Sequence, residues 1–456
     1  MKGNERLSKL VGYLHSRDYK FSGSFKSPIG ARRVIDLRKR IKSEKGSEYP
    51  ETIARYQEAF SDPRIQEAFQ LGGGGVVDLS LDLRLQNGKV YALCLNEVGP
   101  TYSLKDPVIA GLFLMNLMTP GIPIEDMDTL ADCGIFNSAN ATRHYARHFG
   151  LRGEYWMPTN MEHLAKRLRT DDFLIHHENE RFASEENEAK NACYRTLFER
   201  LHKDKDFSGR AFYLGHSELG WAAMYPVAQR NADLLESKGI TPTVLFSCIG
   251  AGTFFVPHAE VFHQRFGTKP VLGEYEEFHP MTDGHDLKIQ VVGGMPEYIP
   301  EHIAQMAREK INSGREVISR KFSENPFIPQ TFWDLVGESY LMGGDPADLA
   351  TVLHFRDKGR NIGITTGGVL SVASEIANKG ETVVVPIYEG FRDYAVQNQD
   401  IESRVISFSS WFNETKMRER MTWGAAAATY MISAGYCWYD MLANNTPFFN
   451  GFTLVK

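Results

Sequence analysis

The sequence predicts an α/β fold that is built on mostly parallel β-sheets. Three continuous apolar runs carry this prediction: residues 243–248 (TVLFSC), 270–275 (PVLGEY) and 381–387 (ETVVVPI). Such runs are typical of strands that are buried on both faces of a parallel sheet. Segments with helical spacing separate them, as expected for an α/β protein. At 456 residues, the chain is long enough for two or more domains with sizeable cores.

The composition is that of an ordinary soluble globular protein, and its formal net charge of −6 argues against a nucleic-acid surface. The five cysteines are scattered and form no CxxC pair, which favours a reducing compartment over a disulfide framework or a zinc site. No apolar segment of a signal peptide is found at the start, so we expect a cytoplasmic protein. Residues 421–439 carry no charge, but their apolarity is too low for a membrane span. We expect them to form a buried or subunit-interface helix.

The first 70 residues are expected to be mostly helical, because residues 31–45 place apolar side chains at helical spacing. Residues 76–85 (VVDLSLDLRL) alternate like a half-buried strand. Asn87 and Gly88 are typical of a hairpin turn, and residues 89–95 (KVYALCL) return as a second strand.

One lysine lies between two apolar elements. Residues 96–107 (NEVGPTYSLKDP) separate the strand at 89–95 from an apolar run at 108–118 (VIAGLFLMNLM), which is typical of a buried helix. Lys105 is therefore expected at a strand-to-helix junction. Partial desolvation lowers the pKa of a lysine, and such an amine can form a Schiff base with a carbonyl cofactor. From the residues alone, the alternative is a surface lysine at a helix start, where the helix dipole is unfavourable for a cation.

The middle of the chain continues the alternation of elements. We expect strands at 130–136 and 153–158, and helices at 141–149, 221–239 and 345–358. Asn140 or Ser138 is suited to cap the helix at 141–149, and Gly150 is suited to end it. His144 and His148 have a spacing that can bind a metal, but flanking arginines and the lack of a third ligand favour a solvated face. We therefore expect no metal site.

Three more motifs follow Lys105 in a fixed order. Residues 137–142 (NSANAT) open a helix, residues 249–253 (IGAGT) follow a strand, and residues 363–368 (GITTGG) precede another helix. Taken singly, each is equally compatible with a helix cap or an ordinary turn. Together, their order resembles the fold type II pyridoxal-phosphate enzymes, the tryptophan synthase β-subunit superfamily to which cysteine synthase and cystathionine β-synthase belong. The resemblance covers residues 72–394, and the N- and C-terminal extensions are unmatched.

A second lysine also resembles the lysine motif of this family. Lys26 lies in residues 22–28 (SGSFKSP), but no apolar strand leads into it. Lys105 precedes Asn140 by 35 residues, close to the family's spacing, whereas Lys26 precedes it by 114 residues. The spacing favours Lys105.

The resemblance implies a role for each motif around pyridoxal 5'-phosphate. Lys105 would form the Schiff base and then remove the Cα proton of the substrate. Asn140 would donate to the phenolic oxygen of the cofactor, and Thr365, with Thr366 as the alternative, would face its ring nitrogen. The residues that would surround the phosphate are Gly250, Ala251, Gly252 and Thr253.

The loop at 137–141 would bind the carboxylate of the substrate. The residues concerned are Asn137, Ser138, Ala139 and Ala141. Ala139 and Ala141 replace the glycine and threonine that are usual in the family, so the details of carboxylate recognition differ. Ser138 also matches the serine that acts as an acid–base catalyst in the family's racemases, although most relatives that are not racemases share it.

The resemblance also implies the domain organisation. It gives two three-layer domains with mostly parallel, twisted sheets and the cofactor in the cleft between them. We expect an N-terminal helical extension at 1–70, a large cofactor-binding domain at 71–125 and 225–395, a smaller mobile domain at 126–224, and a C-terminal helical extension at 396–456. Members of the family are commonly homodimers, and a homodimer is expected here.

The implied activity is β-replacement on a serine-derived or O-activated amino acid, through an aminoacrylate intermediate. Two alternatives keep the fold: β-elimination of the ammonia-lyase type, and racemisation. A catalytically silent binding protein on this scaffold is an alternative of another class. A nucleotide-binding enzyme that uses the loop at 249–253 is disfavoured, because a Walker lysine and an acidic ribose partner are missing at the usual spacing.

Overall fold

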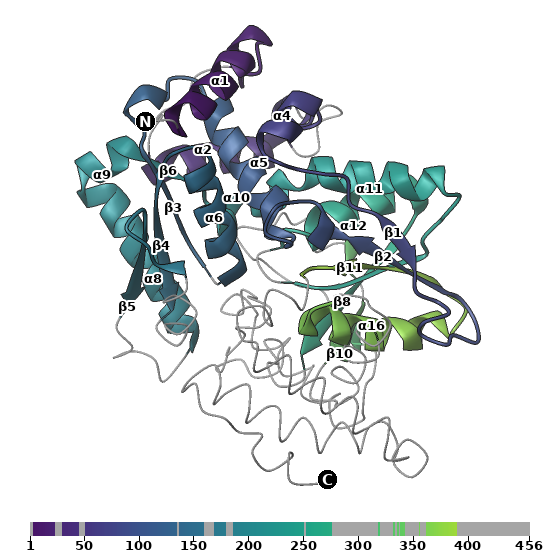
Figure 1. Ribbon diagram of the computed structural model, residues 1–456. Coiled ribbons are helices and arrows are strands. Elements are labelled where there is room, and N and C mark those ends of the chain that lie inside the picture. Colours follow the sequence, from purple (N-terminus) through teal and green to yellow (C-terminus); the bar gives the residue numbers. More distant parts are fainter. Residues whose placement is uncertain are drawn as a thin grey trace, which may run out of the picture.

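The computed structural model describes residues 3–22, 30–44, 51–134, 136–158, 168–178, 186–249, 252–275, 318–319, 332, 335–336, 338–342, 355 and 362–389. These residues form two β-sheets with helices packed against them (Figure 1). The architecture confirms the predicted α/β fold with mostly parallel sheets. Lys26, residues 421–439, the expected C-terminal extension and nearly all of the helix expected at 345–358 lie outside the described residues.

The larger sheet has the strand order β1-β2-β11-β7-β8-β10-β9. Its strands are β1 (Val76–Asp78), β2 (Lys89–Cys94), β7 (Val244–Cys248), β8 (Lys269–Tyr275), β9 (Ile318–Ser319), β10 (Glu338–Met342) and β11 (Thr382–Ile387). The outer pairs β1–β2 and β9–β10 are antiparallel, and the strands between them are parallel. The three apolar runs of the sequence became β7, β8 and β11, within one residue of the predicted bounds.

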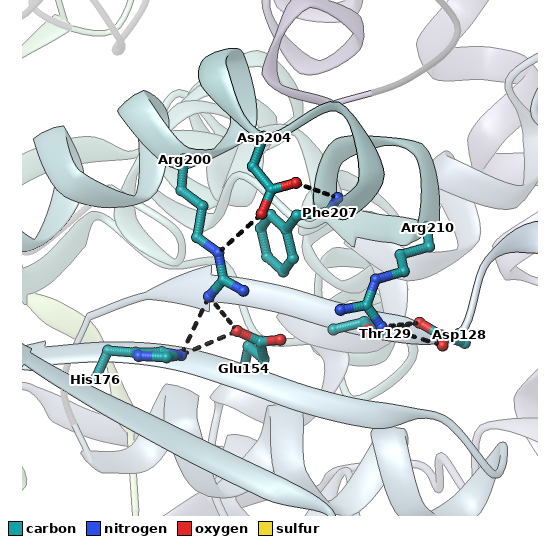
Figure 2. A network of polar contacts seen from close by, with 8 residues as sticks. All are labelled: Asp128, Thr129, Glu154, His176, Arg200, Asp204, Phe207 and Arg210. Atoms are coloured by element: carbon teal, nitrogen blue, oxygen red, sulfur yellow. Dashed lines mark hydrogen bonds and ion pairs between the residues drawn. The ribbon is translucent and has the colours of Figure 1, made fainter.

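The smaller sheet is entirely parallel and has the order β5-β4-β3-β6. Its strands are β3 (Thr129–Cys133), β4 (Arg152–Pro158), β5 (Phe173–Glu178) and β6 (Ala211–Tyr213). Helix α8 (Glu186–Lys203) packs on β4 and is followed by α9 (Lys205–Arg210). Figure 2 shows how Arg200 of α8 reaches down to the carboxylate of Glu154 on β4, where His176 of β5 also binds.

Helix α5 (Lys105–Met118) lies between the two sheets (Figure 1). Every residue of α5 after Lys105 is buried, because its sequence is apolar on all faces. It packs on α6 (Phe136–His148) and α10 (His216–Ala223). The ring of Phe113 meets those of Phe149 and Phe212 edge-on, at centroid distances of 5.3 and 5.1 Å, which joins α5 to the smaller sheet.

Three more helices cover the larger sheet: α11 (Tyr225–Ser237), α12 (Phe255–Phe266) and α16 (Ile364–Ala377). Helix α12 contacts β7 and β8, and α11 packs on α12. Helix α16 contacts β2, β7, β10 and β11. Two short 3₁₀ turns, η1 (Leu95–Glu97) and η2 (Ile124–Asp126), flank the segment that contains α5.

The described part of the N-terminal extension is helical, as predicted. It forms α1 (Gly3–Ser16), α2 (Gly30–Glu44), α3 (Glu51–Phe60) and α4 (Pro63–Ala68). Helix α2 contacts α8, β6 and α10, and α3 contacts α5 and α11. The hydroxyl of Tyr56 donates to the backbone oxygen of Ala223 at 2.6 Å, and both residues are buried. These helices therefore belong to the core.

The strand predicted at 76–85 is much shorter than expected. It ends at Asp78, whose carboxylate accepts the backbone N–H of Ser80 at 2.8 Å. The Ser80 hydroxyl then accepts the N–H of Val90 at 3.1 Å, so side chains replace the ladder bonds. The alternating residues that follow lie in a turn, and Leu81 is 91% exposed.

Two helix boundaries were also predicted wrongly. Helix α6 begins at Phe136, so Ser138 and Asn140 lie inside the helix and neither is its N-cap. Gly150, with φ of +69°, ends the helix as expected. The single helix expected at 221–239 is two helices, because Pro226 occupies the first turn of α11 and favours a new helix start after α10.

Candidate active site

The turn before α5 fixes Lys105 as the first residue of that helix. The carboxylate of Asp106 accepts two hydrogen bonds of 2.8 Å from Thr101, one from its N–H and one from its hydroxyl. Gly99 packs directly on the Asp106 side chain, where any larger residue would collide. Burial raises the pKa of Asp106 to about 6, although these hydrogen bonds favour its charged form.

The residues that follow β11 bind the Lys105 turn. The N–H of Leu104 donates to the backbone oxygen of Tyr388 at 2.7 Å, and Ser103 forms a β-bridge with Glu389. The N–H of Gly363 donates to the Glu389 backbone oxygen at 2.9 Å. The lysine motif and the motif at 363–368 are therefore neighbours in space.

The ε-amine of Lys105 is 2.9 Å from His216 Nε2 and 3.4 Å from the hydroxyl oxygen of Thr253. Thr253 is buried and directly follows Gly252, which has φ of +71°. The loop after β7 is thus close to Lys105. Gly250 and Ala251, the other predicted members of this loop, lie outside the described residues.

These groups meet at one edge of the larger sheet. Strands β2, β11 and β7 run parallel, and the lysine turn, Tyr388 and the loop containing Thr253 follow their carboxyl ends. Ligands of open α/β sheets bind outside this edge. Helix α12 begins beside it, and its N-cap residue, Phe254, makes no side-chain capping hydrogen bond. A helix N-terminus favours an anion such as a phosphate.

Residues 137–141 form the first turns of α6. Asn137 Nδ2 donates to the Glu389 carboxylate at 3.4 Å, so this amide points toward the residues after β11. Ser138 is fully buried and accepts the hydroxyl of Tyr155 at 2.6 Å. Ala139 and Ala141 are fully buried.

Asn140 makes different contacts from Asn137. Its side-chain oxygen accepts from Arg143 at 3.3 Å, and it lines a surface pocket of about 500 Å³ together with Tyr102 and His144. The structure therefore brings Asn137, and not Asn140, next to the Glu389 segment. The predicted contact of Asn140 with the cofactor stays a prediction.

Thr365 lies in the first turn of α16, and its side chain is outside the described residues. The neighbouring Thr366 is fully buried, and its hydroxyl accepts the N–H of Tyr388 at 3.2 Å. Tyr388 in turn bonds through its own hydroxyl to Ser247 at 2.6 Å. Burial raises the pKa of the Tyr388 phenol well above its usual value, so it acts here as a neutral hydrogen-bonding group.

Sequence reasoning missed three polar residues around Lys105: Asp132, His216 and Glu389. His216 follows Gly215 directly after a short strand, a position where polar residues of α/β proteins often reach a site. That pattern was present in the sequence but is weak by itself. Asp132 is the fourth residue of β3 and has almost no solvent exposure.

The two histidines whose spacing can bind a metal, His144 and His148, are bonded within the protein. His144 Nε2 binds the Gln70 side chain at 2.8 Å, and His148 Nε2 binds the Ala68 backbone oxygen at 2.9 Å. Among the described residues, no group of three or more His, Cys, Asp or Glu side chains is placed to hold a metal.

No helix in any of the segments that the structure describes is long and apolar enough to cross a membrane.

No protein-family profile matches the chain, and a search of curated proteins finds no significantly similar sequence. Solved structures do match. A hydrogen sulfide-producing enzyme from Fusobacterium nucleatum has a TM-score of 0.53 at 16% identity, over 73% of this chain and 99% of that enzyme. A mutant O-ureido-L-serine synthase with O-ureido-L-serine bound has a TM-score of 0.52 at 15% identity, over 77% of this chain and 94% of the synthase.

A third structure, an O-acetylserine-dependent cystathionine β-synthase from Helicobacter pylori, has a TM-score of 0.50 at 16% identity. It is matched over 73% of this chain and 96% of its own length. At these identities the likeness concerns the fold. The chain has the mostly parallel α/β fold of the type II pyridoxal-phosphate enzymes.

Proposed function

We propose that this protein is a pyridoxal-phosphate-dependent enzyme that catalyses β-replacement on a serine-derived or O-activated amino acid. The observation that supports it most is the position of Lys105. Its amine lies at the start of a buried helix, at the carboxyl edge of β7 and β11, within 3.4 Å of the Thr253 hydroxyl. The same edge is where ligands bind in open α/β sheets.

The residues present fit such a cofactor. The cofactor needs an amine, an anion site for its phosphate and hydrogen-bond partners for its ring. Lys105 supplies the amine, and the start of α12 with Thr253 beside it supplies an anion site. The glycine loop before Thr253 and the hydroxyl of Thr365 are proposed to complete the phosphate and ring contacts. When bound, pyridoxal phosphate would supply a carbonyl for amines and an electron sink for the substrate.

Lys105 has two proposed tasks. Its amine holds the cofactor, and once an amino acid has displaced it, the same amine takes the proton from the Cα atom as general base. The first turns of α6 are proposed to bind the substrate carboxylate. Asn137, whose amide points toward the Glu389 segment, is proposed to take part in this binding, together with Ser138, Ala139 and Ala141. Asn140 is proposed to donate to the phenolic oxygen of the cofactor.

The test is the visible absorbance of the purified protein as the wild type and as the Lys105→Ala and Lys26→Ala variants. We expect a yellow band that borohydride bleaches in the wild type and in Lys26→Ala but not in Lys105→Ala. Loss of the general base should also slow turnover by about 10²–10⁴-fold. A band that survives Lys105→Ala and disappears in Lys26→Ala would assign the cofactor to the other lysine.

The reaction type is separated by adding L-serine, O-acetyl-L-serine and O-phospho-L-serine, each with and without a thiol nucleophile. A new amino acid that needs the thiol supports β-replacement. Pyruvate and ammonia as the products would identify β-elimination, and D-serine would identify a racemase. A protein that stays colourless after incubation with pyridoxal phosphate would leave only the catalytically silent scaffold.

We further propose a homodimer in the cytoplasm with no nucleic-acid or membrane partner. The proposed domain bounds are those given above, with the larger sheet in the cofactor-binding domain and the smaller sheet in the mobile one. Light scattering coupled to size-exclusion chromatography measures the oligomeric state directly. A monomeric mass would contradict the dimer.

A further inference from the structure

We propose that His216 is a positioning residue that holds the ε-amine of Lys105 and accepts its proton, an inference that rests on the proposed function. After the general-base step, Nζ of Lys105 carries an extra proton. An ammonium has no lone pair and cannot bond to carbon again until that proton leaves. In our proposal the proton moves from Nζ to His216 Nε2, which frees the lone pair on Nζ.

The geometry makes this transfer direct. The two nitrogens are 2.9 Å apart, within ordinary hydrogen-bond distance. His216 is 6% exposed, so water competes little for the contact. It is the first residue of α10, which packs against α5 and therefore holds the two side chains at a fixed separation.

The backbone before His216 is fixed as well. Gly215 has φ of +69° and lies against the side chain of Val34 from α2. A residue with a side chain would be strained there and would collide with Val34. The imidazole therefore enters the site from a turn with little freedom to move.

A short contact between two nitrogens restricts their charges. An ammonium and an imidazolium both only donate, so the contact requires that at least one of the two groups is neutral. When one of the two groups is charged and the other is neutral, the proton that they share lies on either Nζ or Nε2. This is the property that a proton acceptor beside a general base needs.

Carboxylates stand where they would stabilise the charged imidazole. Asp132 is 1% exposed, and its Oδ1 accepts the backbone N–H of Cys133 at 2.9 Å and the backbone N–H of His216 at 3.5 Å. Asp132 Oδ2 is buried without a hydrogen bond from the described residues. Burial raises the pKa of Asp132 to about 7, against the opposing effect of Lys105.

Further charged groups surround the pair on the neighbouring elements. Glu218 lies on α10 itself, is fully buried, and accepts the Tyr213 hydroxyl at 2.8 Å. Burial, together with the charge of Asp132, raises the pKa of Glu218 to about 8, and Arg38 from α2 acts in the opposite direction. When ionised, the buried carboxylate of Asp132 favours a proton on His216, whereas Glu218 adds to this effect only above about pH 8, where it too is charged.

The first test uses the cofactor-free protein and does not depend on activity. The imidazole of His216 is titrated by NMR in the wild type and in Lys105→Ala, and its signal is assigned with His216→Gln. Removing an adjacent cation should raise the pKa of His216 by about one unit or more. His258 is the control in the same spectra, because it is fully buried but bonded to Asn231 and Phe254.

An unchanged His216 titration in Lys105→Ala would overturn the inference, whether or not the protein binds the cofactor. Conversely, a shifted titration in a protein that never becomes yellow would keep the Lys105–His216 contact and reject the proposed function. The two proposals therefore fail separately.

The second test is kinetic. His216→Ala and His216→Gln should both lower kcat by about 10²-fold or more, within the range for proton-transfer groups, with little change in the KM of the amino acid. Glutamine keeps an acceptor for Nζ but cannot take a proton. Full activity in His216→Gln would therefore show that the contact only positions Lys105 and would reject the proton transfer.

Discussion

Two polar clusters on the smaller sheet contain buried carboxylates, but they differ in how these carboxylates are paired. The Glu154 cluster (Glu154, His176, Arg200 and Asp204) has a partner for each charge, as Figure 2 shows. The Asp132 cluster (Asp132, His216, Glu218 and Tyr213) holds two acids, and an oxygen of each has no hydrogen bond from the described residues.

The pKa directions follow the pairing. Burial raises the pKa of Glu154, but the hydrogen bond from His176 and the charge of Arg200 outweigh it, so the value is lowered. In the other cluster burial prevails, and the pKa values of Asp132 and Glu218 are about 7 and about 8. Strongly shifted acids of this kind gather at functional sites, whereas paired ones are typical of structural networks. The cluster next to Lys105 is the one with shifted acids.

The largest effect on stability is expected from breaking the paired cluster. Glu154→Ala removes the buried carboxylate that Arg200 and His176 share and leaves Arg200 only the half-exposed Asp204 at 3.8 Å. Arg200 is also held over the Phe207 ring at 4.0 Å. We expect the free energy of unfolding to fall by about 2–4 kcal/mol, as measured by urea denaturation. Any yellow absorbance band should remain.

The matched control is Glu199→Ala, which removes the 2.7 Å pair of Glu199 with Lys203 on the same helix. Both of those side chains are more than half exposed, so the cost should be about 0.5 kcal/mol or less. An equal loss of unfolding free energy in the two variants would show that the contacts of Glu154 stabilise the fold no more than an exposed ion pair does.

A smaller change in the free energy of unfolding is expected from Asp132→Asn, and this variant should be more stable than the wild type. The folded protein binds a proton at Asp132 more tightly than the unfolded chain does, since its pKa is raised from 3.8 to about 7. The charged carboxylate therefore lowers stability above pH 7, and this cost disappears as the pH falls below about 4. At about 1.4 kcal/mol per pKa unit, this shift corresponds to about 4 kcal/mol. Burial of the asparagine amide offsets about half of it, so the variant should be more stable by about 2 kcal/mol at pH 8.

The same variant should leave stability nearly unchanged at pH 4, and denaturation curves at both pH values give the comparison. Although more stable, Asp132→Asn should turn over more slowly, because the charged imidazole loses its counter-ion. Destabilisation at pH 8 would mean that Asp132 is paired in a way that the contacts do not suggest.

The smallest change in the free energy of unfolding is expected for Asp172, whose charge is paired but whose side chain is only slightly buried. Asp172 binds Arg147 at 2.9 Å, and the hydrogen bond from Arg147, helped by Thr170, lowers its pKa to about 2. Its stabilising effect is present above about pH 4 and is lost as the pH falls through 2.

Because the side chain of Asp172 is 46% exposed, solvent screens the pair. Asp172→Asn should cost about 0.5 kcal/mol at neutral pH and low salt, and less in 1 M NaCl, where the Debye length falls to about 3 Å. A loss of unfolding free energy above about 2 kcal/mol that does not depend on salt would contradict the expectation that an exposed ion pair contributes little to stability.

The elements that the sequence predicted well are those that local pattern determines. Strands β7 and β11 are almost entirely buried, and continuous apolar runs of this kind are typical of strands inside a parallel sheet. Lys105 was placed correctly at the start of α5, because an apolar strand and an apolar helix leave only the short turn between them.

The failures concern contacts between distant residues. The start of α6 was predicted five residues too late, so Asn137, which contacts Glu389, was expected before the helix and lies within it. His216 lies 111 residues after Lys105, so no local pattern connects them. Their proximity arises from the packing of α10 on α5, which only the folded chain reveals.

The N-terminal helices have a consequence for motion within the molecule. Helix α2 touches β6 and α8 of the smaller sheet as well as α10, and α3 touches α5 and α11. If the smaller sheet rotates relative to the larger one, it must either carry α2 along or slide it across α10. Sliding disturbs the packing of Val34 on Gly215, directly before His216. A hinge movement would therefore be transmitted mechanically to the side chain that touches Lys105.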